Sequence, residues 1–208
     1  MQEIKNYGDL KKAVQTWLNR NDSKTVENIP IFINFAEKSF TRLLKLPFYE
    51  TNYTVIYKRN IGHIPIPNDF LNMKHLYIGN KHLTRVDVEN FKNLQTRDAD
   101  QTKPRWFTRI GSQIHIFPEP ADDVTITMLY FKDIVEMKDD FDCPYHLIVS
   151  PEIMLYLSLR HAAIFIRDNE QEQYWMAKAQ ESSDSLMKLL DDAEWTGSSL
   201  VVSQFDDI

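Results

Sequence analysis

Apolar residues near the start of the chain recur every three or four positions, a spacing typical of amphipathic helices. The apolar positions in residues 7–20 are Leu10, Val14, Trp17 and Leu18. A polar link follows, and a second stripe begins after Pro30, a residue favoured in the first turn of a helix. Its members are Phe32, Ile33, Ala36, Phe40, Leu43 and Leu44, and Pro47 ends the pattern. Residues 1–47 are therefore predicted to form two helices packed as a hairpin.

The apolar period falls to two in residues 48–135, which indicates β-strands. Strands are predicted at residues 53–57, 64–66, 82–85, 106–108, 113–117 and 124–131. The turn at Asn60-Ile61-Gly62 favours a hairpin between the first two strands. Residues 71–78 fit either a strand or a helix, and residues 87–94 fit a short helix capped by Asp87. We expect this segment to form an inserted, small antiparallel β unit.

Helical spacing returns in residues 136–194. The triplet Ser150-Pro-Glu152 is a start signal, with the serine as the cap and the proline at the first helical position. Residues 153–166 are apolar on nearly all sides, which is typical of a helix enclosed by other elements. We therefore expect this helix to be buried, with Leu157 and Phe165 in its core.

A more polar helix, capped by Asp168, is predicted to follow and to end near Asp192. The two C-terminal helices are expected to pack with the two N-terminal ones, although the pairs lie far apart in the sequence. The predicted fold class is α+β. It consists of an antiparallel helical bundle formed by the N- and C-terminal helix pairs, an inserted small antiparallel β unit and an extended C-terminal arm.

Residues 195–208 carry a β-prone apolar segment beyond the last predicted helix. Gly197 and the neighbouring serines break the helix, and the apolar side chains after them are Leu200, Val201, Val202 and Phe205. Frayed chain ends are usually polar, so this composition favours an interaction arm that adds to another subunit's surface or sheet edge. A frayed terminus with apolar residues by chance is the alternative.

Composition and charge narrow the possible partners. The 208 residues have a net charge of −6, so a generally basic surface for nucleic acid is absent. Residues 1–104 carry a net charge of +5 and residues 105–208 carry −11, a polarity that favours head-to-tail association between copies. The lone Cys143 excludes an internal disulfide framework. No signal peptide or membrane-spanning run is recognisable, so we expect a soluble, cytoplasmic product.

No catalytic, metal or cofactor site is predicted. The six histidines form no His-x-x-x-His pair, and the five glycines form no phosphate-binding loop. Paired acids occur only in loop or terminal settings. The chain is therefore expected not to be an enzyme. Basic and aromatic residues do cluster at 103–109, where Arg105 and Arg109 are placed to contact phosphate and Trp106 to stack on a base. The period-two alternation of the same segment more simply predicts an edge strand.

Six segments, in this order, resemble the head-to-tail adaptor proteins of tailed bacteriophages. They are residues 7–20, 29–37, 42–44, 64–71, 116–131 and 151–175, with Ile64-Pro-Ile-Pro67 and Pro118-Glu-Pro120 as proline-marked turns. Each motif is weakly specific by itself, but their order spans nearly the whole chain. The chain departs from the looser family pattern in its long link, residues 133–149, and in its tail.

The resemblance implies a structural protein of the virion neck, without enzymatic activity. Such proteins form a ring, usually of twelve copies, that binds beneath the portal protein after DNA packaging. The ring extends the DNA channel without sequence-specific binding and presents a platform to a tail or nozzle protein. The resemblance further implies that a C-terminal arm reaches along the portal. The alternative functions are a nucleic-acid-binding module that uses the segment from Arg105 to Arg109, and a hydrolase whose site matches no recognised motif.

Overall fold

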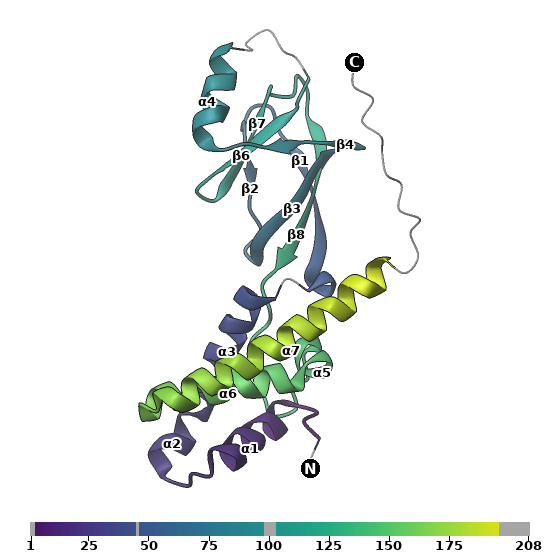
Figure 1. Ribbon diagram of the computed structural model, residues 1–208. Helices are drawn as coiled ribbons and strands as arrows, with labels where there is room; N and C mark the ends of the chain where they lie inside the picture. Colours follow the sequence, from purple (N-terminus) through teal and green to yellow (C-terminus); the bar gives the residue numbers. More distant parts are fainter. Residues whose placement is uncertain (1–2, 45, 98–102, 196–208) are drawn as a thin grey trace. The chain divides into compact units, whose positions relative to one another are not determined.

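The computed structural model describes residues 3–44, 46–97 and 103–195, and its fold is α+β with antiparallel sheets, as the periodicity predicts. The chain divides into two compact units (Figure 1). The helical unit combines the chain up to Leu44 with the chain from Ile134 onward, and the β unit is the segment between them. Sequence-distant helices thus share one unit, while their arrangement as an antiparallel bundle stays a prediction.

The helical unit is organised around one helix. Its described elements are α1 (Tyr7–Leu18), α2 (Ser23–Glu27), α3 (Ile29–Leu43), α5 (Tyr145–Val149), α6 (Pro151–Ile166) and α7 (Asn169–Trp195). Helix α6 contacts α1, α3, α5 and α7, and Leu157 on it has no exposed surface. The burial of α6 is confirmed: a helix that is apolar on nearly all sides leaves water only when helices surround it. Phe165, however, is 37% exposed, so its expected place in the core is wrong.

The helix starts confirm one predicted cap and overturn another. Asp168 accepts a hydrogen bond from the N–H of Gln171 at 3.1 Å, as its place before α7 predicts. Ser150 makes no side-chain cap. Its hydroxyl instead donates to the carbonyl of His146 at 3.0 Å, because the short helix α5 precedes it and leaves that carbonyl within reach. Helix α7 continues to Trp195, beyond the predicted end.

The β unit contains two four-stranded sheets. Its described elements are β1 (Glu50–Tyr57), β2 (Ile64–Pro65), β3 (Phe70–Ile78), β4 (Lys81–His82), β5 (Thr84–Arg85), β6 (Trp106–Ile110), β7 (Gln113–Phe117), β8 (Val124–Lys132), the helix α4 (Val88–Arg97) and a 3-10 turn (Pro47–Tyr49). One sheet has the order β1-β8-β3-β4 and the other β2-β7-β6-β5. Residues 70–78 are therefore a strand, and Asp87 caps α4 by accepting the N–H of Asn90 at 2.8 Å, as predicted.

The predicted hairpin between residues 53–57 and 64–66 is wrong. Strand β1 pairs with β8 along its whole length, whereas β2 pairs with β7 in the other sheet. Tyr57 and Ile64 both belong to the one buried cluster that the two sheets share. The chain therefore crosses between sheets after Tyr57, because this places apolar residues from both sheets in a common core.

We predict that Leu157→Ala lowers the free energy of unfolding by about 2–5 kcal/mol, because the truncation leaves a cavity in a fully buried site. Phe165→Ala should cost clearly less, since its ring is partly in water. Urea denaturation followed by circular dichroism measures both values. Leu189→Ala, at a residue 67% exposed on α7, is the matched control and should change little. Equal losses for Leu157→Ala and Leu189→Ala would contradict the central place of α6.

Candidate functional site

The basic and aromatic side chains of β6 make contacts within the β unit. Trp106 stacks on Phe117 with ring centroids 6.2 Å apart. Arg109 donates from Nε to the carbonyl of Gly111 at 2.9 Å and lies over the ring of Phe70 at 5.2 Å. Arg105 is exposed. The Trp106 ring and the Arg109 guanidinium are thus engaged within the β unit, which makes them less available to bind DNA.

Strand β6 is also not an edge strand, so that prediction is wrong. It lies between β7, which pairs with it in an antiparallel register, and β5, which pairs with it in parallel. The two-residue strand β5 covers only Trp106 and Phe107, a partner too short for periodicity to reveal. The four apolar residues proposed for the arm, Leu200, Val201, Val202 and Phe205, lie outside the described residues, and their role stays a prediction.

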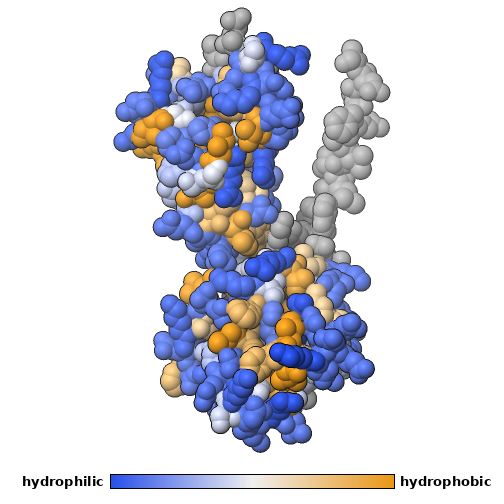
Figure 2. Space-filling model, turned by 90° about the vertical axis from the view of Figure 1, so that its left-hand side faces the viewer, coloured by the Kyte–Doolittle hydropathy of each residue, from blue (hydrophilic) through white to orange (hydrophobic). Residues whose placement is uncertain are grey.

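Exposed apolar side chains gather on the helical unit, as the space-filling view shows (Figure 2). One group, which we call the α3–α6 patch, consists of Ile31, Phe35 and Phe165, exposed by 47%, 52% and 37%. Phe165 packs against Phe32 with ring centroids 5.2 Å apart, and Phe35 meets the ring of His161 at 5.6 Å. Both contacts join α3 to α6, so Phe35 and Phe165 lie along the border between these two helices.

The α3–α6 patch is held from below and bordered by charge. Ser39 Oγ and His161 Nε2 lie 3.0 Å apart, which fixes the imidazole against which Phe35 rests. Burial lowers the pKa of His161, and the charge of Arg160 lowers it further. Lys24 lies over the ring of Phe165, with its Nζ 5.7 Å from the centroid. The surface is therefore aromatic with a cation at its margin, a composition suited to protein contacts.

A second exposed apolar group lies on the link that precedes α5. Phe141 is 89% exposed, the largest exposed fraction among the large apolar residues described. The backbone on either side of it is fixed. The N–H of Gly8 donates to the carbonyl of Asp140 at 2.9 Å, and the N–H of Tyr7 donates to the carbonyl of Asp142 at 2.9 Å. Phe141 is therefore presented to solvent by a loop that the start of α1 holds in place.

Side chains reinforce the same loop. Asp142 accepts the N–H groups of Lys138 and Asp139 at 2.7 and 2.8 Å, and these bonds lower the pKa of its carboxyl group. Lys11 forms an ion pair with Asp140. Cys143 donates from its thiol to the carbonyl of Lys5 at 2.7 Å, so this cysteine contributes a loop contact.

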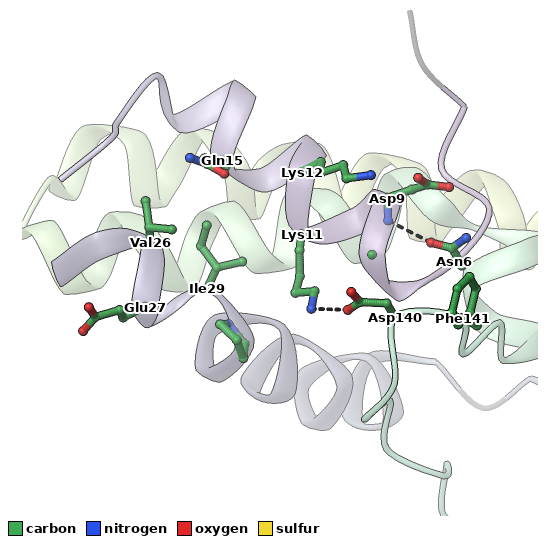
Figure 3. A pocket seen from close by; sticks show the side chains of 12 residues that line it. Asn6, Asp9, Lys11, Lys12, Gln15, Val26, Glu27, Ile29, Asp140 and Phe141 are labelled. Atoms are coloured by element: carbon green, nitrogen blue, oxygen red, sulfur yellow. Dashed lines mark hydrogen bonds and ion pairs between the residues drawn. The ribbon is translucent and has the colours of Figure 1, made fainter. Parts of the chain in front are cut away.

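An open groove of about 490 Å³ lies between this loop and the first three helices (Figure 3). Its apolar lining residues are Val26, Ile29, Pro30 and Phe141, and most of the others are polar or charged. The charged ones are Lys11 and Lys12 on α1 and the acids Asp9, Glu27 and Asp140, of which Asp140 pairs with Lys11. Such a groove fits a polypeptide segment better than a small molecule, because it is shallow and carries both charges.

Beneath the loop lies a buried acid that the sequence reasoning missed. Glu37 is 1% exposed, and its Oε1 accepts the N–H of Met137 at 3.0 Å, which ties the link to α3. Burial raises the pKa of Glu37 from 4.5 to about 7. His146, which is fully buried, has its Nε2 3.8 Å from the same oxygen, and burial lowers its pKa from 6.5 to about 4. A signal was present, since Glu37 occupies an apolar-stripe position between Ile33 and Phe40.

Two further properties limit the chemistry. Within residues 3–44, 46–97 and 103–195, no group of three or more His, Cys, Asp or Glu side chains is arranged to hold a metal ion. In that same part of the chain, no helix has the length and apolar character needed to cross a membrane.

Comparison with known protein families gives a match over most of the chain. A family model described as SU10 adaptor protein matches residues 5–203 of this chain. The match includes both the helical unit and the β unit, and it confirms the resemblance seen in the order of the motifs. No curated protein matches the chain.

We predict that Glu37→Gln and His146→Gln change the pH dependence of stability in opposite directions. Folded Glu37 binds its proton more tightly than the unfolded chain does, so its contribution is full below pH 4.5 and lost as pH rises toward 7. Folded His146 binds a proton less tightly, so its contribution is lost as pH falls from 6.5 toward 4. In the wild type the two effects offset each other between about pH 4.5 and 6.5.

Urea denaturation at several pH values measures the effect. Relative to wild type, the free energy of unfolding of Glu37→Gln should rise by about 3 kcal/mol between pH 4.5 and 7. The free energy of unfolding of His146→Gln, again relative to wild type, should fall by a similar amount as pH rises from 4 to 6.5. Differences that stay constant with pH would show that neither group shifts its pKa on folding.

Proposed function

Since this chain belongs to the SU10 adaptor family of phage head-to-tail adaptors, we propose that it is a subunit of the adaptor ring in the virion neck. In this proposal the ring, usually of twelve copies in such proteins, binds beneath the portal after DNA packaging. It extends the DNA channel and provides the platform to which a tail or nozzle protein attaches. The observation that carries the proposal is the family match over residues 5–203.

The surface of the helical unit supports assembly into a larger structure. The α3–α6 patch and Phe141 expose large apolar side chains that a permanently monomeric protein gains nothing from exposing. The charge difference along the sequence, +5 over residues 1–104 and −11 over residues 105–208, does not divide the molecule into a basic and an acidic end, because segments of both halves lie in the helical unit.

Net acidity supports passive passage of DNA. A channel that bound phosphate tightly would slow a genome that has to leave through it, because each phosphate contact adds to the affinity. The net charge of −6 argues against such retention. In this proposal the segment from Arg105 to Arg109 belongs to the β unit's structure, and the protein carries out no catalysis.

The segment after α7, residues 196–208, is proposed as the arm that fastens the ring to the portal. Thirteen residues, if extended, reach roughly 43 Å, enough to cross a neighbouring subunit. Four apolar side chains, Leu200, Val201, Val202 and Phe205, would supply the contacts, with main-chain pairing if the arm joins a sheet edge of the portal. Electron microscopy of the protein mixed with a portal from the same genome tests the whole proposal. Rings seated on the portal are expected, and particles without them would contradict it.

We predict that deletion of residues 198–208 leaves the free energy of unfolding unchanged while portal attachment and genome retention fail. Val202→Asp and Phe205→Asp should reproduce the deletion, because a charge would be buried in an apolar contact. Asp206→Asn with Asp207→Asn is the matched control and should do less. The readouts are denaturation, co-sedimentation with portal and the count of filled particles. Filled, infectious particles assembled with the shortened protein would rule out the arm as an attachment device.

We predict little DNA binding by the isolated chain at moderate salt, and the same for Arg105→Ala with Arg109→Ala. Gel shifts at about 50 and 200 mM salt make the comparison, because phosphate-based affinity falls steeply over this range. The alternative function predicts a different result. Binding by the wild type that survives moderate salt, and that the double variant loses, would identify a nucleic-acid-binding module.

A further inference from the structure

We propose that Phe141 of one copy docks on the α3–α6 patch of a second copy, and that this contact joins neighbouring subunits head to tail. The inference rests on the proposed ring and specifies the surfaces that build it. Its two halves are Phe141 with the acidic loop around it, and the patch of Ile31, Phe35 and Phe165 with Lys24 at its margin.

The loop that carries Phe141 is organised before any partner arrives. Two backbone hydrogen bonds from the start of α1, at Tyr7 and Gly8, hold the carbonyls on either side of the ring. The Asp142 carboxylate closes the loop on its own N–H groups, and Lys11 pairs with Asp140. A ring that is 89% exposed on so firmly held a backbone loses little freedom when it is buried. This is the property expected of an anchor in a protein interface.

Gly8 shows how closely the loop is seated. A Cβ added at this position would lie 3.2 Å from the carbonyl oxygen of Asp140 and 3.3 Å from its Cβ. These contacts are tight, so a methyl group at this position would shift the backbone beside Phe141 by a few tenths of an ångström. Gly8 thus contributes to the position of the anchor.

The α3–α6 patch provides aromatic surface and a positive charge for the incoming Phe141. Phe35 and Phe165 present aromatic rings to solvent, so an incoming phenylalanine can pack edge to face against them. Lys24, over the Phe165 ring, is exposed at the margin. Asp140 and Asp142, which flank Phe141 in the sequence, are engaged within the loop, so the exposed Asp139 is the acid placed to meet this cation. Aromatic surface and charge are thus complementary across the contact.

The complementarity of the two surfaces points to a second copy as the occupant. Phe141 is 89% exposed, so it is not packed on the patch of its own chain. The anchor and the patch are two different surfaces of the helical unit, since Phe141 lies beside α1 whereas Phe35 and Phe165 lie on α3 and α6. Contact between unlike surfaces is heterologous, and such contacts repeat from copy to copy until a ring closes.

Complementation between variants tests the pairing. Phe141→Ala and Phe35→Ala should each lower the self-association constant of the full chain, measured by sedimentation, by about 10-fold or more. An equal mixture should form heterodimers that grow no further, because each variant keeps one intact surface. Leu189→Ala is the matched control and should associate like wild type. Both substitutions are at exposed rings, and unchanged circular dichroism confirms the fold. A mixture no better than either variant alone would overturn the heterologous pairing.

Cross-linking detects the contact even where association is weak. In a Cys143→Ser background, in which the serine hydroxyl still reaches the Lys5 carbonyl, Phe141→Cys copies are mixed with Phe35→Cys copies. A short bis-maleimide should join this pair at least about 10-fold more than Phe141→Cys with Leu189→Cys. Gly8→Ala should reduce the yield, because it displaces the loop. Yields equal to the control, with and without portal, would overturn the proposal, as would capture of Phe141→Cys by the portal in place of a second copy.

These outcomes separate the inference from the proposed function. If the portal captures the wild-type protein but the two cysteine variants do not cross-link, this interface is ruled out and the adaptor function still stands. Cross-linked chains that the portal does not capture support the interface and contradict the adaptor function.

Discussion

The enclosure of α6 is the constraint on which the helical unit depends. This helix is apolar on nearly every side, and Leu155, Leu157 and Leu159 on successive faces are all buried. One partner helix covers one face only, so the chain needs helices on several sides of α6. Helices α1 and α3, supplied from the other end of the sequence, and α7 meet this need. The β unit is consequently an insertion between the two parts of a single helical unit.

The same constraint creates the link that carries the exposed anchor. Once the chain has left the β unit it has to return to α6 past the N-terminal helices, and this return is secured at several points. Glu37 accepts the Met137 N–H beneath the surface, while Gly8 receives the loop at the start of α1. A buried acid is costly unless it is neutral or hydrogen-bonded, and its raised pKa reflects that cost. The buried carboxyl group is tolerated because it accepts the Met137 N–H, which would otherwise be buried without a hydrogen-bond partner.

Sequence patterns predicted the helices and caps that depend on residues close together in the chain. The helix around Leu157 follows from its apolar pattern, and the caps at Asp87 and Asp168 follow from short-range geometry. Strand pairings between distant segments leave no such pattern. The predicted hairpin between residues 53–57 and 64–66 is therefore wrong, and the parallel pairing of β5 with β6 at Trp106 was not predicted. The candidate surfaces were harder still. The exposure of Phe141 depends on hydrogen bonds to Tyr7 and Gly8, which no periodicity connects to it. The family resemblance came from the order of weak motifs, whereas the site came from the structure.

A subunit that assembles on a template needs contacts that are specific and individually weak. Strong self-association would close the ring before its partner was present, whereas contacts without fixed geometry would not select one neighbour. In the proposed ring, a preorganised side chain such as Phe141 would meet both needs, because a single aromatic anchor contributes modest affinity while its fixed backbone would set the angle between copies. Closure of such a ring would depend on many equal contacts forming together, so it would gain stability only when all of its members are in place.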